Sequence, residues 1–550
     1  MLIQNVEIRK KNTKEKFYCR RLIILKICFS FCFFIITLAF NACGVPPKTE
    51  MRTLLPNNAV VYLETNDLAK TLESLTESPA FQELAERKPD FSFLRQMQIA
   101  AAVTKISGAE KQISDKNAVI SFTPQFVAVA ETHLWSWQTA SFVENQLDNF
   151  VRKNYGEATK LKITEKESGK FYEWTAIDNR QVFAYARESL IYFGTDAAAI
   201  ENCIRVKKGE TDNLLKNEAL TRVYTANNMT FGYVSTEGIK EISDFAAVFL
   251  AVEATEETTG RSFIARLLPE LLQNSAREII WTANKTERGI EDKFYINSTE
   301  KLALVAGETL APAQLPPSDA VEFLPADIFS ATRYNLQNPL LAWRSLLFVT
   351  AENSDALSRR FLLEFSGRLL EPYKISDAET FLSLIEPEIF TVQFDQEGEK
   401  TVAIVAVKDK EKIKKAISQE INFKSEPEKN QAEIWFATDK TSAAAFVENK
   451  LILGDSRSVL QCLQAKQSGE QFIKTRRFRG FAENQATAVT IGKEVEAADK
   501  IVRVLANKTQ ENRKLATFYS TETRFTKSGI ERQTISDFGL LGMILQQLKP

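Results

Sequence analysis

Short apolar stretches bounded by turn residues predict strands along much of this chain. Residues 181–194 and 442–454 each read as two short apolar strands around a tight turn, which is typical of a β-hairpin. Residues 125–130 and 401–407 are continuous apolar runs, as in strands that are buried on both faces. The same pattern therefore occurs twice, and in both places a buried strand precedes a hairpin.

Each predicted hairpin is followed by a segment with helical spacing. The apolar positions of the two segments are Ile200, Cys203 and Ile204, and Val459, Cys462 and Leu463. Asp196 and Ser456 stand where an N-cap is expected, and Gly209 and Gly469 stand where a helix would end. Both segments are therefore predicted to be helices with their own start and stop signals.

Three more helices are predicted between the strands. Residues 66–75 carry leucines on one face, with Asn66 as the expected N-cap, and residues 141–153 and 410–418 follow the two buried strands. Strands, helices and tight turns thus alternate in a mixed order. This order predicts an α+β fold with a mainly antiparallel sheet and helices on one face.

The sequence also contains an internal repeat. The matching pairs of segments are 54–65 with 323–333, 174–178 with 435–439, 188–210 with 448–470, and 286–294 with 526–534. The proline-rich stretch 311–320 lies between the two sets. We therefore expect two tandem homologous α+β halves, residues 54–310 and 321–550, joined by a linker at 311–320. Each half is expected to be a mainly antiparallel sheet with packed helices.

The layout resembles a family of uncharacterised exported bacterial proteins that is known only as a domain of unknown function. In that family a strand after a Leu-Pro pair leads to a helix, and a strand ending in Gly-Asp-type residues leads to another. The matching positions here are Leu55-Pro56, Leu324-Pro325, Leu190 to Asp196, and Leu451 to Asp455. The likeness covers most of the chain, and the family has no assigned activity to transfer.

The N-terminal segment has the organisation of an export signal. Residues 1–26 carry eight basic and two acidic side chains, and residues 27–40 are almost purely apolar. The uncharged stretch extends to Pro46 and is at the short end for a membrane-spanning helix. Residues 1–42 are therefore predicted to be either a cleaved signal peptide or an uncleaved signal anchor, with the remaining chain exported.

Cys43 is a candidate site for lipid attachment, which bears on the choice between a cleaved signal peptide and a signal anchor. The residues before it resemble the lipobox of bacterial lipoproteins: Ala42 fits, whereas Phe40 replaces the usual leucine and Asn41 is larger than the usual small residue. The resemblance implies that lipoprotein-processing enzymes attach lipid to the Cys43 sulfur and cleave before it. Several acyl chains make a stable membrane anchor. Residues 43–53 are then expected to be a tether, and the protein to lie in the bacterial cell envelope.

Charge and composition narrow the classes of function. The net charge is −1 for the chain and −7 once the +6 of residues 1–42 is removed, without a block of Lys and Arg in the remainder. Nucleic acids require clustered positive charge, so they are not expected partners. His133 is the only histidine, which excludes a multi-histidine metal site. No metal, cofactor or catalytic residue is therefore predicted.

The segment "HLWSWQ" (133–138) is the candidate binding segment. His133, Trp135 and Trp137 alternate, so on a strand they would share one face and could stack on a sugar ring or a peptide. An aromatic anchor at the edge of the core explains the same spacing. If a binding site arose after the duplication, these three residues are the candidate, because no similar stretch occurs in the second half.

Other reactive side chains have simpler interpretations. Cys203 and Cys462 are interpreted as small buried hydrophobes, with a disulfide as the alternative that export permits. Glu386, Glu388 and Asp395 supply carboxylates, and a solvated turn before a strand is the main interpretation of this segment.

These observations predict a membrane-anchored, extracytoplasmic and non-enzymatic protein that binds or scaffolds an unknown envelope component. One alternative is a carrier or chaperone for lipid or apolar peptide, with the two halves enclosing a groove. The other alternative is a hydrolase that depends on carboxylates alone.

Overall fold

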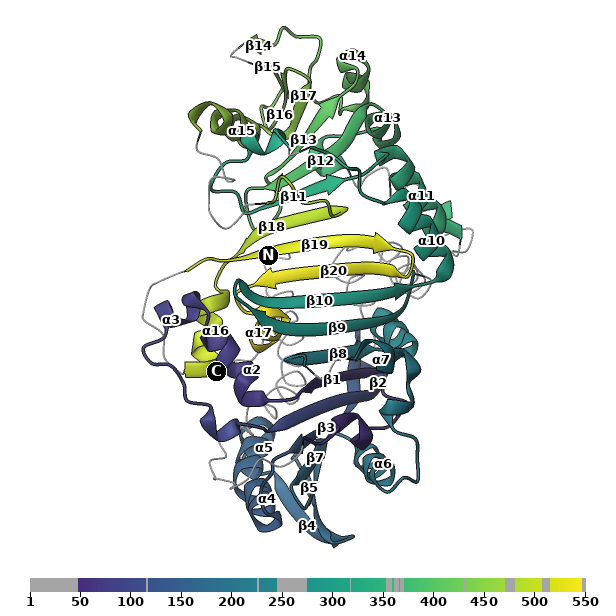
Figure 1. Ribbon diagram of the computed structural model, residues 1–550, viewed down its shortest axis with the longest axis vertical. Coiled ribbons are helices and arrows are strands. Elements are labelled where there is room, and N and C mark those ends of the chain that lie inside the picture. The colour runs from purple at the N-terminus through teal and green to yellow at the C-terminus, as the bar shows by residue number, and fades with distance from the viewer. Residues whose placement is uncertain are drawn as a thin grey trace.

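The computed structural model shows an elongated α+β protein built on one antiparallel sheet (Figure 1). The structure describes residues 48–114, 117–224, 227–244, 275–316, 318–352, 359–360, 366, 370–429, 432–469, 480–506 and 515–546. Twenty strands of these residues belong to the sheet, and all the pairings between them are antiparallel. The predicted α+β class with an antiparallel sheet is confirmed.

Ten strands come from residues 48–310, called the N-terminal half below, and ten from residues 311–550, called the C-terminal half. The first ten are β1 (Val61–Thr65), β2 (Gln98–Ser114), β3 (Asn117–Glu131), β4 (Lys160–Lys166), β5 (Gly169–Thr175), β6 (Gln181–Arg187), β7 (Leu190–Gly194), β8 (Thr230–Val234), β9 (Ala276–Thr286) and β10 (Gly289–Ser298). The others are β11 (Ser330–Asn335), β12 (Ile385–Gln393), β13 (Thr401–Val407), β14 (Glu428–Lys429), β15 (Glu433–Phe436), β16 (Ser442–Val447), β17 (Lys450–Asp455), β18 (Ala488–Glu494), β19 (Thr517–Thr526) and β20 (Gly529–Ser536).

The order of strands in the sheet is palindromic. From one end to the other it runs β4-β5-β6-β7-β3-β2-β1-β8-β9-β10-β20-β19-β18-β11-β12-β13-β17-β16-β15-β14. The middle strands cross the long axis of the molecule, and the outer strands turn away from them, as expected for a twisted sheet (Figure 1). The two halves therefore meet through hydrogen bonds between β10 and β20, inside one sheet.

The predicted hairpins and buried strands are present. β6 and β7 pair around Glu188, and β16 and β17 pair around Glu448, both with positive φ (+55° and +54°). The apolar run 125–130 lies within β3, and the run 401–407 is β13. Continuous apolar sequence here reflects burial on both faces of the sheet.

Helices connect the strands and cover both faces of the sheet. Those of the N-terminal half are η2 (Met51–Leu54), α2 (Leu68–Thr76), α3 (Pro79–Leu84), η3 (Ser92–Leu94), α4 (Ser136–Phe142), η4 (Val143–Leu147), α5 (Asp148–Tyr155), α6 (Ala197–Lys207), η5 (Leu214–Lys216), α7 (Glu218–Val223) and α10 (Glu300–Thr309). Those of the C-terminal half are η6 (Ala320–Phe323), α11 (Pro339–Glu352), η7 (Glu371–Tyr373), α13 (Ala378–Ser383), α14 (Lys410–Ile413), η8 (Lys414–Ala416), α15 (Ser456–Ser468), α16 (Ala497–Ala506) and α17 (Gly539–Leu545).

Two of the predicted N-caps are one residue away from the observed ones. Asp67, not Asn66, caps α2 by accepting a hydrogen bond from the Lys70 amide. Asp455, not Ser456, caps α15. In both pairs the carboxylate is the acceptor, and a negative charge at a helix N-terminus is also favoured by the helix dipole.

The other helix signals give mixed results. The predicted cap Asp196 is confirmed for α6. Gly209 and Gly469 follow the ends of α6 and α15 with φ of +77° and +71°. The helix predicted at 141–153 begins earlier, at Ser136, and its middle turn η4 is a π-helix. The helix predicted at 410–418 ends at Ala416, after a 3₁₀ turn.

The prediction of helices on one face is wrong. Along β3, Phe126, Ala128 and Ala130 pack in a core cluster with α2, α3 and α5, whereas Val127 and Val129 pack in another with α6. In the C-terminal half, α15 and α13 likewise belong to separate core clusters. Alternate strand residues point to opposite faces, so both faces of these strands need cover.

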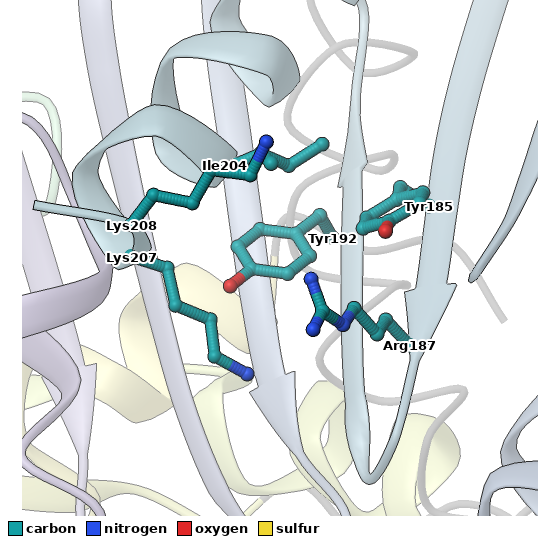
Figure 2. Close-up of a pocket in the computed structure, with 6 residues that line it drawn as sticks. All are labelled: Tyr185, Arg187, Tyr192, Ile204, Lys207 and Lys208. Atoms are coloured by element: carbon teal, nitrogen blue, oxygen red, sulfur yellow. The ribbon is translucent and has the colours of Figure 1, made fainter. Parts of the chain in front are cut away.

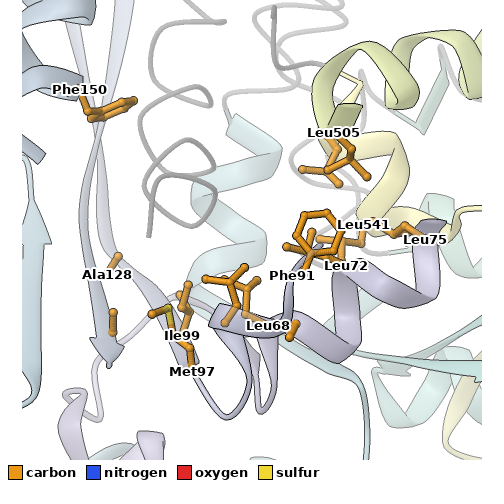
Figure 3. Packing of buried hydrophobic residues seen from close by; sticks show 14 of the residues in the cluster. Leu68, Leu72, Leu75, Phe91, Met97, Ile99, Ala128, Phe150, Leu505 and Leu541 are labelled. Carbon is orange, nitrogen blue, oxygen red and sulfur yellow. The ribbon is translucent and has the colours of Figure 1, made fainter. Parts of the chain in front are cut away.

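The largest core cluster joins the two halves. Figure 3 shows Leu72 and Leu75 of α2 beside Leu505 of α16 and Leu541 of α17. On the other side, Ala306 and Leu310 of α10 pack against Ala342 of α11. The two halves are therefore joined by the packing of α2 against α16 and α17 and of α10 against α11, in addition to the β10–β20 pairing.

The last residues of the predicted tether at 43–53 are part of the folded body. Met51 and Leu54 of η2 are buried in the core cluster that contains α6, and Arg52 is buried with them. Residues 1–47, including Cys43, lie outside the described residues. The predicted linker is held at Ala313, whose carbonyl accepts a hydrogen bond from the Asn335 side chain.

Candidate functional site

The first described residues contact the start of β2 and the end of β3. The Thr49 amide donates to Gln98 Oε1 (2.8 Å), and Gln98 Nε2 donates back to the Thr49 carbonyl (2.7 Å). Thr49 Oγ1 also donates to Glu131 Oε2 (3.3 Å). Gln98 and Glu131 are both buried, so the chain joins the folded body at a fixed place.

His133 lies beside that place. Its backbone amide donates to Glu131 Oε1 (3.0 Å), and its Nδ1 is 3.6 Å from the same oxygen. His133 has a φ of +55°, a left-handed conformation that turns the chain after β3. Its Nε2 is buried without a hydrogen-bond partner among the described residues. The only histidine of the chain is therefore fixed by Glu131, which also contacts Thr49.

The two tryptophans of the candidate segment are on the surface. Trp135 is 74% exposed and Trp137 is 70% exposed. β3 ends at Glu131 and α4 begins at Ser136, so the three residues do not lie on a strand and the shared strand face considered for them is absent. The interpretation of Trp135 and Trp137 as core-edge anchors is also wrong, because they bury little area. Two exposed indoles are consistent with a contact surface.

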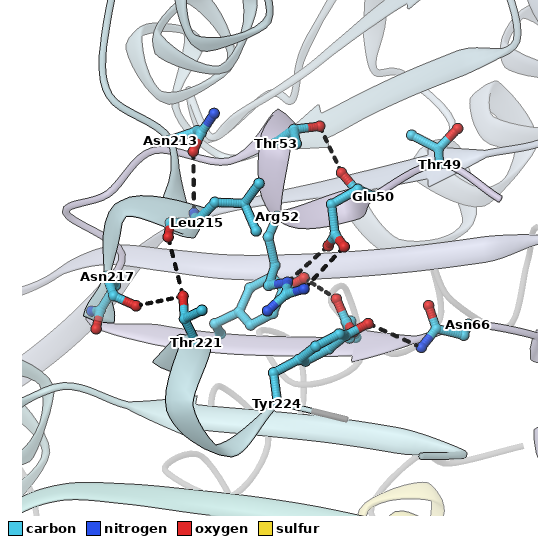
Figure 4. A network of polar contacts seen from close by, with 12 residues as sticks. Thr49, Glu50, Arg52, Thr53, Asn66, Asn213, Leu215, Asn217, Thr221 and Tyr224 are labelled. Atoms are coloured by element: carbon cyan, nitrogen blue, oxygen red, sulfur yellow. Dashed lines mark hydrogen bonds and ion pairs between the residues drawn. The ribbon is translucent and has the colours of Figure 1, made fainter. Parts of the chain in front are cut away.

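A buried polar network lies under η2 (Figure 4). Arg52 donates from Nε and Nη2 to the two carboxylate oxygens of Glu50 (2.8 and 2.9 Å), and its guanidinium carbon is 3.2 Å from the centre of the Tyr224 ring. Asn66 Nδ2 is 3.5 Å from the Tyr224 hydroxyl. A bidentate ion pair stacked on an aromatic ring favours arginine over lysine.

Two residues of β1 complete this network. Tyr62 and Glu64 point to the same buried side, and the Tyr62 hydroxyl donates to Glu64 Oε2. Burial raises the pKa of Glu64, while the Tyr62 hydrogen bond and the Arg52 charge oppose that rise. Burial also raises the pKa of Tyr224, to about 12. The sequence interpretation missed this network, although a glutamate at a buried position of an alternating strand was a readable signal.

In the segment 323–333, whose sequence matches 54–65, the position that matches Glu64 holds an arginine that pairs with a glutamate. Arg333 on β11 is fully buried and donates from Nε to Glu388 Oε1 (2.6 Å) and from Nη1 to the Asn484 carbonyl (2.8 Å). Ser318 Oγ donates to the other oxygen of Glu388. Glu388 therefore neutralises a buried cation, and this role accounts for it without acid–base chemistry.

The remaining candidate carboxylates are on the surface. Glu386 and Glu388 lie on β12, so the interpretation of this segment as a turn before a strand is wrong. Glu386 is exposed. Asp395 accepts hydrogen bonds from the Lys400 amide in the turn between β12 and β13. Glu388 and Asp395 thus have separate local roles.

The two cysteines of the body are buried and free. Cys203 belongs to the core cluster with α6, and Cys462 belongs to the cluster with α15. Burial raises the pKa of both thiols, which keeps them in the less reactive protonated form. The interpretation of both as small buried hydrophobes is confirmed, and the structure contains no disulfide between them.

A small basic pocket lies at the end of the β6–β7 hairpin (Figure 2). Its lining residues are Tyr185, Arg187, Tyr192, Ile204, Lys207 and Lys208. Lys207 and Lys208 lie at the C-terminal end of α6, where the helix dipole favours cations. Arg187 and the two tyrosines come from the paired strands, so only the fold brings these six residues together.

Asp292 is the most strongly perturbed carboxyl outside these sites. Trp281 Nε1 donates to its Oδ1 (2.7 Å), and the Leu540 amide donates to its Oδ2 (2.9 Å). Burial raises the pKa of Asp292 to about 6, and these hydrogen bonds oppose the rise. Asp292 joins β10 to the start of α17, where the two halves meet.

We expect Asp292 to give the protein a specific dependence of stability on pH. A carboxyl whose folded-state pKa is raised from 3.8 to about 6 stabilises the fold fully below pH 3.8, and this contribution is lost as pH rises through 6. The wild type should therefore gain about 2 kcal/mol relative to Asp292→Asn between pH 7 and pH 4. Urea unfolding of both proteins across this range measures the difference. Parallel pH profiles would contradict the assignment.

Membrane and metal signals are absent from the described part of the chain. Within these ranges, no helix combines the length and the apolar character needed to cross a membrane. The same ranges contain no group of three or more His, Cys, Asp or Glu side chains that could hold a metal ion. No family model matches this chain, and neither a curated protein nor a solved structure matches it. The resemblance to an uncharacterised exported family therefore stays a prediction.

Proposed function

We propose that this protein is a membrane-anchored envelope protein whose body, built from two copies of one unit, binds another envelope component without catalysis. The observation that carries the proposal is the apolar stretch 27–40 that ends at Cys43, a few residues before the folded body begins. From Cys43 to Thr49 the chain spans at most about 20 Å when extended. Lipid on Cys43 would therefore keep the body close to the membrane surface.

The exposed tryptophans support a defined orientation of the body. Thr49 contacts Glu131, and Glu131 contacts His133, two residues before Trp135. Trp135 and Trp137 thus lie near the point where the anchored segment joins the body. Tryptophan prefers the boundary between membrane and water because its ring is apolar and its N–H is polar. We infer that this surface faces the membrane or a partner held there.

The duplication is supported by the symmetry of the sheet. The matching segments 289–291 and 529–531 both read Gly-Ile-Glu. With Ile290 matched to Ile530, Ile296 is matched to Ser536. In the β10–β20 pair, Ile290 lies opposite Ser536 and Ile296 lies opposite Ile530, so exchanging the two strands leaves the register unchanged. A Cβ atom on Gly289 would meet the Ser536 carbonyl oxygen, and one on Gly529 would meet that of Ile296. Matched glycines thus have matched surroundings.

Mass spectrometry of the N-terminal peptide tests the anchor. We expect a peptide that begins at Cys43 and carries diacylglycerol on the sulfur. Cys43→Ala should lose this modification, while Cys203→Ala serves as the control because that thiol is buried and free. An unmodified Cys43 in an uncleaved chain would favour the signal anchor. Intact, unmodified protein found free in the cytosol would refute the proposal.

Membrane binding by the body itself is tested with the same samples. Protein that lacks the anchor should remain soluble or bind membranes weakly. Any remaining membrane binding should fall when Trp135 and Trp137 are both replaced by serine. Replacing the exposed Ile177 by serine provides a matched control, since its side chain is 82% exposed and lies in a different turn. Equal binding by both variants would remove the tryptophans from the contact surface. The carrier and hydrolase alternatives stay predictions that no contact described above favours.

A further inference from the structure

The pocket at the β6–β7 hairpin combines a small cavity with donors of hydrogen bonds. Its volume is about 120 Å³, which is below the range of about 300–1,000 Å³ that is usual for drug-sized ligands. Arg187, Tyr192 and Lys207 turn toward a common space, with Lys208 at the end of α6 above them (Figure 2). The pocket thus has the size of a small chemical group and is lined by donors from two strands and one helix.

Tyr192 is the buried donor of this pocket. The residue is 1% exposed, and its hydroxyl has no hydrogen-bond partner among the described residues. Burial raises the pKa of Tyr192 well above its usual value, so the hydroxyl stays neutral and can donate. A buried hydroxyl without a hydrogen-bond partner destabilises the fold, because it loses its hydrogen bonds to water without replacing them. An acceptor bound in the pocket would remove this penalty.

The charges around Tyr192 favour an anion as that acceptor. Three cationic side chains line the pocket, from Arg187, Lys207 and Lys208. Two carboxylates face them: Glu188 is 3.1 Å from Lys207 Nζ and 3.5 Å from Arg187 Nε, and Glu167 is 2.6 Å from Lys208 Nζ. Both carboxylates have a lowered pKa because of their lysine partners, so they are ionised. A third carboxylate, Glu210, also acts on the charge of Lys208, but it is 3.6 Å from Arg205 Nε, so one excess positive charge remains at the pocket.

The C-terminal half shows that the fold does not require these polar groups. In the same register of the β16–β17 hairpin and α15, the positions of the pocket residues Tyr185, Arg187, Tyr192 and Lys208 hold Ala445, Val447, Ile452 and Gln467. Lys466 takes the position of Lys207 and likewise pairs with a turn glutamate, Glu448 (3.9 Å). An apolar residue therefore fills the place of Tyr192 in an otherwise similar hairpin and helix.

We propose that this pocket binds a phosphate-type oxyanion. The Tyr192 hydroxyl and the Arg187 guanidinium donate to its oxygens, and the Lys207 ammonium supplies further charge. A phosphate group offers more acceptor oxygens than a carboxylate and matches a set of donors that approach from several elements. The inference does not depend on the anchor or on the tryptophan surface. The phosphate can belong to a free ion or to a lipid headgroup, and these two sources are separable by experiment.

Calorimetric titration of the full-length protein in detergent tests this site. Inorganic phosphate and a short-chain phosphatidic acid are the two probes, each compared with chloride at equal ionic strength. We expect saturable binding of at least one probe, and the probe that binds identifies the source of the phosphate. Tyr192→Phe should weaken binding about tenfold or more, because it removes a hydrogen bond to a charged group. Saturable binding of neither probe would overturn the proposal.

Matched variants separate binding from folding. Lys207→Gln should weaken binding, whereas Lys466→Gln, at the equivalent position of the other half, should leave it unchanged. Tyr192→Phe should melt at the same temperature as the wild type or higher when phosphate is absent, since the lost hydroxyl has no partner. Arg187→Gln gives a second test of the pocket if Tyr192→Phe fails to fold. Binding by Arg187→Gln and Tyr192→Phe that equals wild-type binding would also overturn the proposal.

Discussion

Replacing Arg333 by alanine should lower the free energy of unfolding by about 3–5 kcal/mol. Arg333 is fully buried, and its ion pair with Glu388 lies within hydrogen-bond distance at 2.6 Å. Without the guanidinium, the Asn484 carbonyl loses this donor and Glu388 keeps only the hydrogen bond from Ser318, so a carboxylate is left near the core without its cation. Chemical unfolding followed by circular dichroism measures the loss.

The ion pair Arg344–Glu379 provides the matched control. Its atoms are 2.8 Å apart, but both side chains are more than half exposed. Water screens such a pair, so Arg344→Ala should lower the free energy of unfolding far less than Arg333→Ala does. If the two arginine variants lose the same stability, the Arg333 pair has no special role. Replacing both Arg333 and Glu388 by apolar residues should recover much of the loss, because no unpaired charge then remains.

Gly529→Ala should destabilise the junction between the two halves by about 3 kcal/mol or more. The backbone at Gly529 has a φ of +142°, which side chains with a Cβ atom rarely adopt, and such strain costs about 1–3 kcal/mol. A Cβ atom there would also lie 2.1 Å from the Ile296 carbonyl oxygen, so β10 and β20 would have to separate. Inserting an extra carbon atom into a closely packed site adds a further destabilisation of about 1–3 kcal/mol.

Hydrogen exchange locates this effect. The amides of β10 and β20 should exchange faster in Gly529→Ala, while those of β16 and β17 should be unchanged. Gly209→Ala is the control, because Gly209 also has a positive φ but nothing lies within 4 Å of its Cβ position. It should cost only the backbone strain, about 1–2 kcal/mol. Uniformly faster exchange across the whole sheet would show that the clash is not local.

Local sequence patterns predicted the parts of the fold that depend on neighbouring residues. The hairpins at 181–194 and 442–454 were readable because apolar strands flank a turn, and the ends of α6 and α15 because a glycine follows each. Burial of Cys203 and Cys462 followed from their place on an apolar helix face. In each case the decisive contacts lie within one hairpin or one helix.

The arrangement of the whole molecule could not be predicted in this way. The β10–β20 pairing, and the packing of α2 against α16 and α17, join residues far apart in the sequence. Apolar runs in β3 and β13 signalled burial, but not which helix covers each face. The single-face prediction failed because cover for the second face comes from helices that precede or follow these strands at a distance.

The candidate sites were predicted only in part. The segment 133–138 was singled out for its aromatic residues, yet its exposure depends on where β3 ends and α4 begins. Glu388 was treated as a surface carboxylate because its partner Arg333 lies on another strand. Tyr192 looked like one more apolar strand residue, and only the packing of α6 reveals that its hydroxyl has no partner.

The two outermost strands of the sheet, β4 and β14, are the places where the sheet of another molecule could pair with this one. β4 is bonded only to β5, and β14 only to β15, among the described strands. A free strand edge can recruit another chain and start aggregation. β4 carries Lys160, Lys162 and Lys166 along this edge, and β14 is only two residues long. The lysines of β4 and the shortness of β14 both oppose pairing of these edges with the strands of another molecule.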